Sequence, residues 1–350
     1  MARLKYRQQP LWKNYIIKRC RKRWNNVALV TVLDRRTRIQ QMDMTMIPRT
    51  ASAHGDDIIS VQRSFHYMCH VLNKLQFNSV IKKLNHGADK FAYSCITESP
   101  TVRSFPDMLL EAKNRSIGYS ERFVSQVIGS LMETVIFCHK HNCVNLNLNI
   151  GMYLTSNLCF KSMYTLLITH LCVYIYICVC VCVESDDLAF DSELRPILMD
   201  FSRALIIEPN DKVPQINYHI RTCLSWFLGC VTVWIASMMS STPPELAMLM
   251  GTDSSEGSIE LNGKTLRKAD SWRVGVLLYA LMTGMLPYTA STLQNFITQI
   301  LMQKPAVPLD EIKCSQHLKR LLAQLLEPAY FKRIDIQDAI KDPWFSVMLC

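Results

Sequence analysis

Apolar residues near the start of the chain alternate with polar ones, and further along they recur at helical spacing. Residues 27–33 and 42–47 are rich in Val, Leu, Ile and Met, which predicts two strands joined by a charged turn. In 59–75, apolar residues return every three or four positions, as in an amphipathic helix. A longer helix is predicted over 120–140, where Ser120 is a suitable N-cap.

Helical patterns return in the last third of the chain. Residues 269–285 have the pattern of a buried helix, and residues 318–326 have the one-sided pattern of an amphipathic helix. The chain ends soon after the compact segment DPWF at 342–345.

Two stretches interrupt these patterns because they contain no Lys, Arg, Asp or Glu. Residues 162–183 form a run of 22 such residues, which is long enough for a transmembrane helix. Tyr-Ile and Cys-Val dipeptides repeat toward its end, as alternating TA and TG dinucleotides would encode, which favours translated non-coding sequence such as a retained intron. A membrane span and a buried or edge strand hairpin are the alternatives. The second stretch, 223–239, has 17 residues and lies at the lower limit for a bilayer span.

The positive charge is concentrated at the N-terminus. Residues 1–40 contain twelve Lys or Arg and one acid, Asp34, so that segment carries +11 while the whole chain carries +10. Such a run can bind nucleic acid, an acidic membrane surface or an import receptor, and a solvated basic arm is the simplest interpretation. Because the rest of the chain is nearly neutral, nucleic-acid binding across the whole protein is not expected.

Cysteine usage and the N-terminus both indicate a cytoplasmic or nuclear protein. The 14 cysteines show no paired C-x2-C pattern, so reduced thiols are expected rather than a metal site. No apolar segment follows Arg3, Lys5 and Arg7, and Ala2 excludes myristoylation. A membrane location is the alternative if 162–183 is a genuine span.

Two long motifs near the C-terminus resemble protein kinases, with the calcium- and calmodulin-dependent group as the nearest type. Residues 268–288 (KADSWRVGVLLYALMTGMLPY) are similar to the large central helix of the kinase C-lobe, and residues 318–345 are similar to its closing segment. In the same register, Asp200 opens the D-F-G position, 243–245 (PPE) takes the A-P-E position, and 138–154 takes the catalytic loop.

The resemblance implies an α+β, two-lobed protein-kinase fold. A basic arm at 1–25 would precede a small β-rich N-lobe at about 26–98 and a large helical C-lobe at about 99–345. The chain is longer than a kinase at about 158–185 and 223–239, which marks both segments as probable insertions. Residues 265–345 are expected to be helices and loops.

The resemblance also implies that most catalytic groups are missing. No glycine precedes Gly55, so the glycine loop is absent. The remaining positions of the catalytic set are filled as follows: Thr45 in place of the phosphate-binding Lys, Met68 in place of its Glu partner, Asn147 in place of the base, Asn149 in place of the second catalytic-loop Lys, and Met152 in place of the metal-binding Asn. Only Asp200 remains as a Mg2+ or nucleotide ligand, with Ser202 replacing the D-F-G glycine. No cofactor is therefore expected, and any binding of ATP and Mg2+ should be weak.

The scaffold residues, by contrast, match the kinase pattern. Glu245 and Arg333 correspond to the buried ion pair that ties the activation segment to the C-lobe, and Asp270 corresponds to the carboxylate that holds the catalytic-loop backbone. Trp272 and Trp344 are expected to fill the helical core.

Three interpretations follow. The first is a pseudokinase, a binding or regulatory module with an unidentified protein partner. The second is a weakly active or atypical ATP-dependent serine/threonine kinase. The third is a mis-assembled gene product that contains translated introns.

Overall fold

The computed structural model describes residues 11–22, 28–49, 58–99, 103–104, 108, 119–144, 188–191, 193, 195–199, 201, 205–207, 241–251, 262–290 and 292–349. The segments 162–183 and 223–239 therefore lie outside the described residues, and so do the catalytic-loop positions at 145–152 and Asp200. Within the described part, no helix is long and apolar enough to cross a membrane.

The N-terminal part is a five-stranded antiparallel sheet with the order β1-β2-β3-β5-β4. Its strands are β1 (Tyr15–Lys22), β2 (Ala28–Asp34), β3 (Gln41–Pro48), β4 (Lys83–Ala88) and β5 (Ala92–Glu98). The two strands predicted at 27–33 and 42–47 are confirmed as β2 and β3. Strand β1 shows that part of the basic N-terminal run is built into the sheet as an edge strand.

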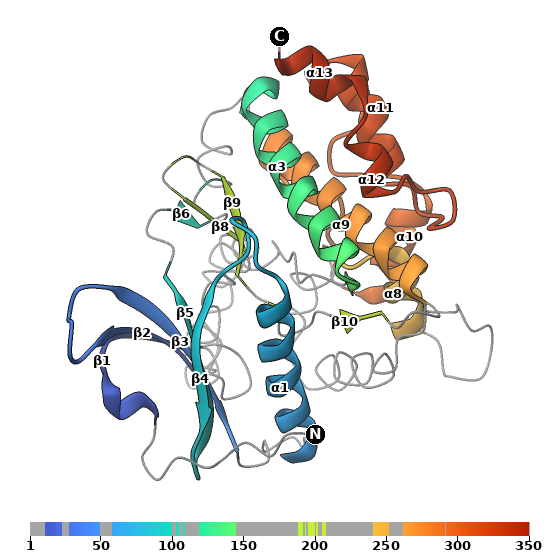
Figure 1. The fold of residues 1–350 in the computed structure, drawn as a ribbon. Helices are drawn as coiled ribbons and strands as arrows, with labels where there is room; N and C mark the ends of the chain where they lie inside the picture. Colours follow the sequence, from blue (N-terminus) through green and yellow to red (C-terminus); the bar gives the residue numbers. More distant parts are fainter. Residues whose placement is uncertain are drawn as a thin grey trace, which may run out of the picture.

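The two faces of the sheet pack against different partners. One face is covered by the short 3-10 helix η1 (Leu11–Asn14) and forms a small core of its own, here called the outer core. Its buried members are Leu11, Tyr15, Val30, Val32, Met42, Met44 and Ile96. The other face, here called the inner face, lies against helix α1 (Ile58–Lys74), which runs alongside the sheet (Figure 1).

Helix α1 confirms the amphipathic helix predicted at 59–75. The ring of Phe65 stacks on Tyr93 of β5 with centroids 5.1 Å apart, and Phe65 is fully buried. One turn further along α1, the buried thiol of Cys69 lies close to that of Cys95, two residues beyond Tyr93 on the same side of β5. These contacts dock α1 on the inner face.

The C-terminal part is helical. Its elements are α3 (Glu121–Lys140), α8 (Pro244–Gly251), α9 (Gly263–Thr283), α10 (Leu293–Leu301), α11 (Gln316–Leu325), α12 (Ile336–Ala339) and α13 (Pro343–Leu349). The described residues of 265–345 are helix, turn or loop, as predicted. The Ser120 side chain accepts a hydrogen bond from Phe123 N, which confirms the predicted N-cap of α3. Short strands lie between the two parts: β6 (Arg103–Ser104), β7 (Cys143–Val144), β8 (Leu188–Phe190), β9 (Pro196–Leu198) and β10 (Leu205–Ile206).

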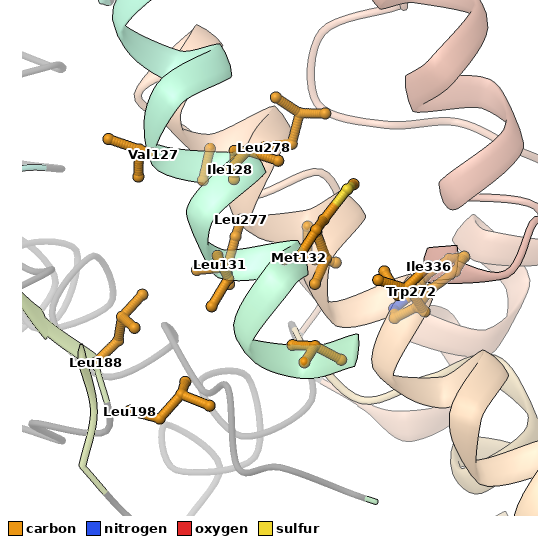
Figure 2. Packing of buried hydrophobic residues seen from close by; sticks show 14 of the residues in the cluster. Val127, Ile128, Leu131, Met132, Leu188, Leu198, Trp272, Leu277, Leu278 and Ile336 are labelled. Atoms are coloured by element: carbon orange, nitrogen blue, oxygen red, sulfur yellow. The ribbon is translucent and has the colours of Figure 1, made fainter. Parts of the chain in front are cut away.

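Helix α9 is the centre of the helical part, and α3 packs along it. Figure 2 shows Ile128, Leu131 and Met132 of α3 beside Leu277 and Leu278 of α9, all of them buried. The main hydrophobic core continues from these helices to α1 and to the inner face of the sheet. Each Å2 of apolar surface removed from water contributes about 25 cal/mol to the free energy of folding. Because this continuous core buries most of the large apolar side chains, it is the main source of stability.

Close approach of α11 to α9 depends on a glycine. A Cβ atom at Gly275 would lie 2.8 Å from Leu325 Cβ and 3.1 Å from Leu326 Cδ2. Helix α9 then ends at Gly284, whose φ of 68° places it in the left-handed region where glycine is favoured. The glycine of the T-G-x-x-P pattern is thus explained, because it forms the C-cap of α9.

Candidate functional site

The candidate nucleotide-binding surface is the inner face of β3, where a kinase would carry its phosphate-binding lysine. Side chains alternate along a strand, so Met42 and Met44 enter the outer core while Asp43, Thr45 and Ile47 share the opposite face. Ile47 packs against the main core, which confirms that this face is the one next to α1. None of the three residues on this face carries a positive charge.

Asp43 is the unexpected member of this face. It is only 7% exposed, and its Oδ1 accepts a hydrogen bond from Thr31 Oγ1 of β2 at 3.1 Å. On the other side, Thr97 Oγ1 of β5 donates to the Asp43 carbonyl oxygen at 3.5 Å. The register pairs Asp43 with both threonines, so a polar band crosses three strands. The sequence signal for this band is an acid between Met42 and Met44, and it was not used in the sequence-based prediction.

Thr45 lies next to this band. It is paired with Cys95 of β5 and is half-buried. Two strand residues span about 7 Å, so the Thr45 side chain and the Asp43 carboxylate are near neighbours on one face. The Thr45 hydroxyl carries no positive charge, and a carboxylate repels a phosphate group.

The position expected to hold the partner of the missing lysine is also uncharged. Met68 on α1 is 7% exposed and belongs to the main core. Residues 23–27, between β1 and β2, have the sequence RWNNV and contain no glycine. Asn147, Asn149, Met152, Asp200 and Ser202 lie outside the described residues, so their arrangement stays a prediction.

The predicted ion pair between Glu245 and Arg333 is confirmed. Arg333 donates from both terminal nitrogens to the two carboxylate oxygens of Glu245, each at 2.9 Å, and both side chains are at most 2% exposed. The guanidinium also donates to the carbonyl oxygens of Glu327, Lys268 and Pro328, at 2.8, 2.8 and 3.3 Å. Its carbon lies 5.0 Å from the Trp272 ring. Arg333 therefore joins α8, α9 and the segment before α12.

Asp270 is buried within α9 and is shared by two donors. His139 Nε2 lies 2.9 Å from its Oδ2, and Arg273 donates to Oδ1 at 3.1 Å. The backbone of 145–152, which Asp270 is expected to hold, lies outside the described residues. His139 Nδ1 has no hydrogen-bond partner among the residues that the structure describes. Sequence analysis did not single out His139, because its partner lies 131 residues away.

A second polar junction was also missed. Glu121, at the start of α3, accepts hydrogen bonds from Ser315 N and Ser315 Oγ, both at 2.6 Å, and from Trp344 Nε1 at 2.8 Å. It thereby joins the first turn of α3 to the N-cap of α11 and to α13. Trp344 itself is fully buried, as predicted.

Comparison with known proteins finds partial similarity to several protein kinases. Over 82 residues the chain is 34% identical to CBL-interacting protein kinase 10 of Oryza sativa subsp. japonica, a match that covers 23% of this chain and 18% of the relative. Over 79 residues it is 32% identical to sperm motility kinase Z of Mus musculus, covering 23% of this chain and 15% of the relative. Over 78 residues it is 35% identical to a serine/threonine-protein kinase SIK3 homolog of Danio rerio, covering 22% and 6%. Over these stretches of about 80 residues, the chain is similar to serine/threonine protein kinases.

The relation is confined to a small part of each protein. The chain spans less than a fifth of the length of these kinases, and no family model matches it. The predicted resemblance to the kinase superfamily is confirmed, and the five-stranded antiparallel sheet followed by helices is compatible with a kinase fold. The buried Glu245–Arg333 pair lies where the kinase resemblance predicts an ion pair.

Metal chemistry is not indicated in the described part of the chain. No group of three or more His, Cys, Asp or Glu side chains there is placed to hold a metal ion. The described cysteines are free thiols, in line with the cysteine pattern: Cys69, Cys95, Cys138, Cys143 and Cys314. Burial raises the pKa of the Cys138 thiol far above its ordinary value, so it stays protonated and packs as an apolar side chain.

Proposed function

We propose that the chain is a pseudokinase: a two-lobed, protein-kinase-like module that binds a protein partner and does not transfer phosphate. The single observation that carries this proposal is the inner face of β3, where Thr45 stands in the lysine position and Asp43 adds a carboxylate beside it. Scaffold pairs such as Glu245–Arg333 are intact, which supports a folded module.

Electrostatics explains why this face disfavours a nucleotide. Lysine in this position attracts the phosphates, and its loss leaves them without that attraction. A phosphate charge about 7 Å from the Asp43 carboxylate would be repelled by about 2 kcal/mol at an effective dielectric constant of about 20. The amide of Asn147 in the base position cannot accept the proton of a substrate hydroxyl. Each missing group supplies several kcal/mol of transition-state stabilisation, so their combined loss is incompatible with ordinary turnover.

The first test is ATP binding by the full chain, measured as a thermal shift with and without Mg2+. We expect no measurable shift at about 1 mM ATP, because a ligand at or below its dissociation constant stabilises by no more than about 0.4 kcal/mol. Thr45→Lys alone should not change this result, since the new ammonium would pair with the Asp43 carboxylate. Asp43→Asn/Thr45→Lys removes that competitor while an amide oxygen still accepts from Thr31, and it should gain a measurable ATP shift.

The second test is phosphate transfer from radiolabelled ATP to a generic Ser/Thr peptide. Wild type and Asp200→Ala should give the same background, which a contaminating kinase would supply. Robust transfer by the wild type that disappears in Asp200→Ala would contradict the proposal and establish an atypical active kinase. Equal ATP shifts for Thr45→Lys and Asp43→Asn/Thr45→Lys would show that Asp43 plays no part.

A further inference from the structure

The loop between β2 and β3 is an exposed basic surface with an apolar tip. Residues 35–40 are all exposed, and they include three arginines and an isoleucine. Ile39 is 87% exposed, more than any other large apolar side chain in the described part of the chain. Lys13 of η1 is exposed beside this loop, because Arg35 N donates to Asn14 O at 3.0 Å. We call Lys13, Arg35, Arg36, Arg38 and Ile39 the loop patch.

Internal hydrogen bonds hold the loop patch in one conformation. Asp34 Oδ1 accepts from Arg36 N at 2.7 Å and from Thr37 N at 3.2 Å, and Asp34 O accepts from Arg38 N at 2.9 Å. Arg35 Nε donates to Tyr15 O at 3.1 Å, which fixes the loop to β1. The Asp34 carboxylate therefore faces backbone amides, and the four cations together with Asp34 give a net charge of about +3. A preformed surface binds with a smaller loss of conformational entropy.

We propose that the loop patch docks the protein on the surface of an anionic lipid bilayer. Arginine guanidinium groups would contact lipid phosphates and carboxylates, while Ile39 would enter the boundary between headgroups and acyl chains. In sequence, residues 1–40 together carry a net charge of +11, so positive charge is concentrated in this segment. This docking is peripheral and does not depend on residues 162–183 or on the proposed loss of kinase activity.

The exposed isoleucine decides between a bilayer and a nucleic acid. Nucleic acids are bound through phosphate contacts together with stacking or hydrogen bonds to bases. A single aliphatic side chain at the tip of the loop contributes little to any of these contacts. Inserted into a bilayer, the same side chain is removed from water, which is favourable.

The test is co-sedimentation of the full chain with vesicles of phosphatidylcholine alone or with about 30% phosphatidylserine. We expect binding only to the vesicles that contain phosphatidylserine, weakening as salt is added. Arg36→Ser/Arg38→Asn should weaken it on the order of 30-fold, at about fivefold for each cation. Asn is chosen at position 38 because the φ of 55° there suits Asn better than most residues. Ile39→Ser should weaken it roughly tenfold.

A matched control is available elsewhere on the surface. Phe331 is 70% exposed and Lys332 follows it, so Phe331→Ser/Lys332→Ser also removes one large apolar residue and one cation. This control should bind like the wild type, and thermal melts should show that every variant is folded. About 10 mM inorganic phosphate at constant ionic strength should leave vesicle binding unchanged, which separates a bilayer from a free phosphate ligand.

Three results would overturn the proposal. The first is equal binding to vesicles with and without phosphatidylserine. The second is vesicle binding that survives Arg36→Ser/Arg38→Asn. The third combines two measurements: a DNA or RNA oligonucleotide binds the wild type but not Arg36→Ser/Arg38→Asn, and Ile39→Ser does not change vesicle binding. This result would assign the loop patch to nucleic acid.

Discussion

Breaking the Glu245–Arg333 pair should be among the most damaging polar changes in the helical part. Glu245→Gln keeps the size of the side chain but leaves the Arg333 charge buried, at 1% exposure, without its counterion. Removing one partner of a buried pair costs about 3–5 kcal/mol, a large share of the stability of a typical domain. The three carbonyl acceptors of Arg333 remain, so the lower half of that range is expected for Glu245→Gln.

A double-mutant cycle tests whether the two residues act as a pair. Arg333→Met leaves the buried Glu245 carboxylate without its counterion and removes the donor from three partly buried carbonyl oxygens, so it should cost at least as much as Glu245→Gln. In Glu245→Gln/Arg333→Met no unpaired charge remains. The double variant should therefore be more stable than the sum of the two losses predicts, by about 2 kcal/mol.

The assay is urea unfolding followed by circular dichroism and tryptophan fluorescence. The Lys341–Asp338 pair supplies the control, because both side chains are about 70% exposed. Asp338→Asn should leave the unfolding midpoint unchanged, since solvent screens such a pair. A loss below about 1 kcal/mol for Glu245→Gln, or a strictly additive cycle, would refute a structural role for the pair.

Two further results are expected from packing and from thiol chemistry. In the same urea assay, Gly275→Ala should destabilise the protein by about 1–3 kcal/mol, because its Cβ would overlap Leu325. Gly129→Ala is the control, since its Cβ would lie 3.6 Å from Phe345, and it should be neutral or stabilising. Burial and the nearby Glu121 carboxylate raise the pKa of the Cys314 thiol to about 11. Because the thiolate is the reactive form, alkylation of Cys314 by iodoacetamide should rise about tenfold per pH unit from pH 7 to 10. A rate that levels off near pH 9 in peptide mapping would contradict this assignment.

The spacing of apolar residues predicted the strands and helices whose apolar side chains lie on one face, and the helix whose apolar side chains cover every face. Strands β2 and β3 and helices α1, α3 and α11 were predicted close to their observed bounds, whereas α9 begins at Gly263, six residues before its predicted start. Strand β1 was missed because its sequence, YIIKRCRK, is dominated by charge, as edge strands often are. The β4–β5 hairpin was missed although Asp89 forms its turn, accepting from Phe91 N and Ala92 N at 2.7 and 3.0 Å.

Polar partners distant in sequence were predictable only where the kinase resemblance supplied both members. Glu245 and Arg333 are 88 residues apart, and the resemblance named them together. Glu121 and Trp344 are 223 residues apart, and no local pattern connects them. The hydrogen bond of Asp43 was not predicted for a different reason. Its partner Thr31 becomes a neighbour only through the register of β2 with β3.

Folding and phosphate transfer impose different demands on these residues, and the difference explains why one set is present and the other is not. Glu245, Arg333 and Asp270 are buried polar groups, so losing one member of such a contact leaves an unsatisfied charge in the core. Thr45 faces no such demand, because Asp43 already accepts a hydrogen bond from Thr31 and the position expected to hold the partner of a lysine is the apolar Met68. Threonine and methionine at these positions are thus compatible with a folded core, and neither carries a positive charge. A kinase-like chain can keep its scaffold and lose this chemistry without losing stability.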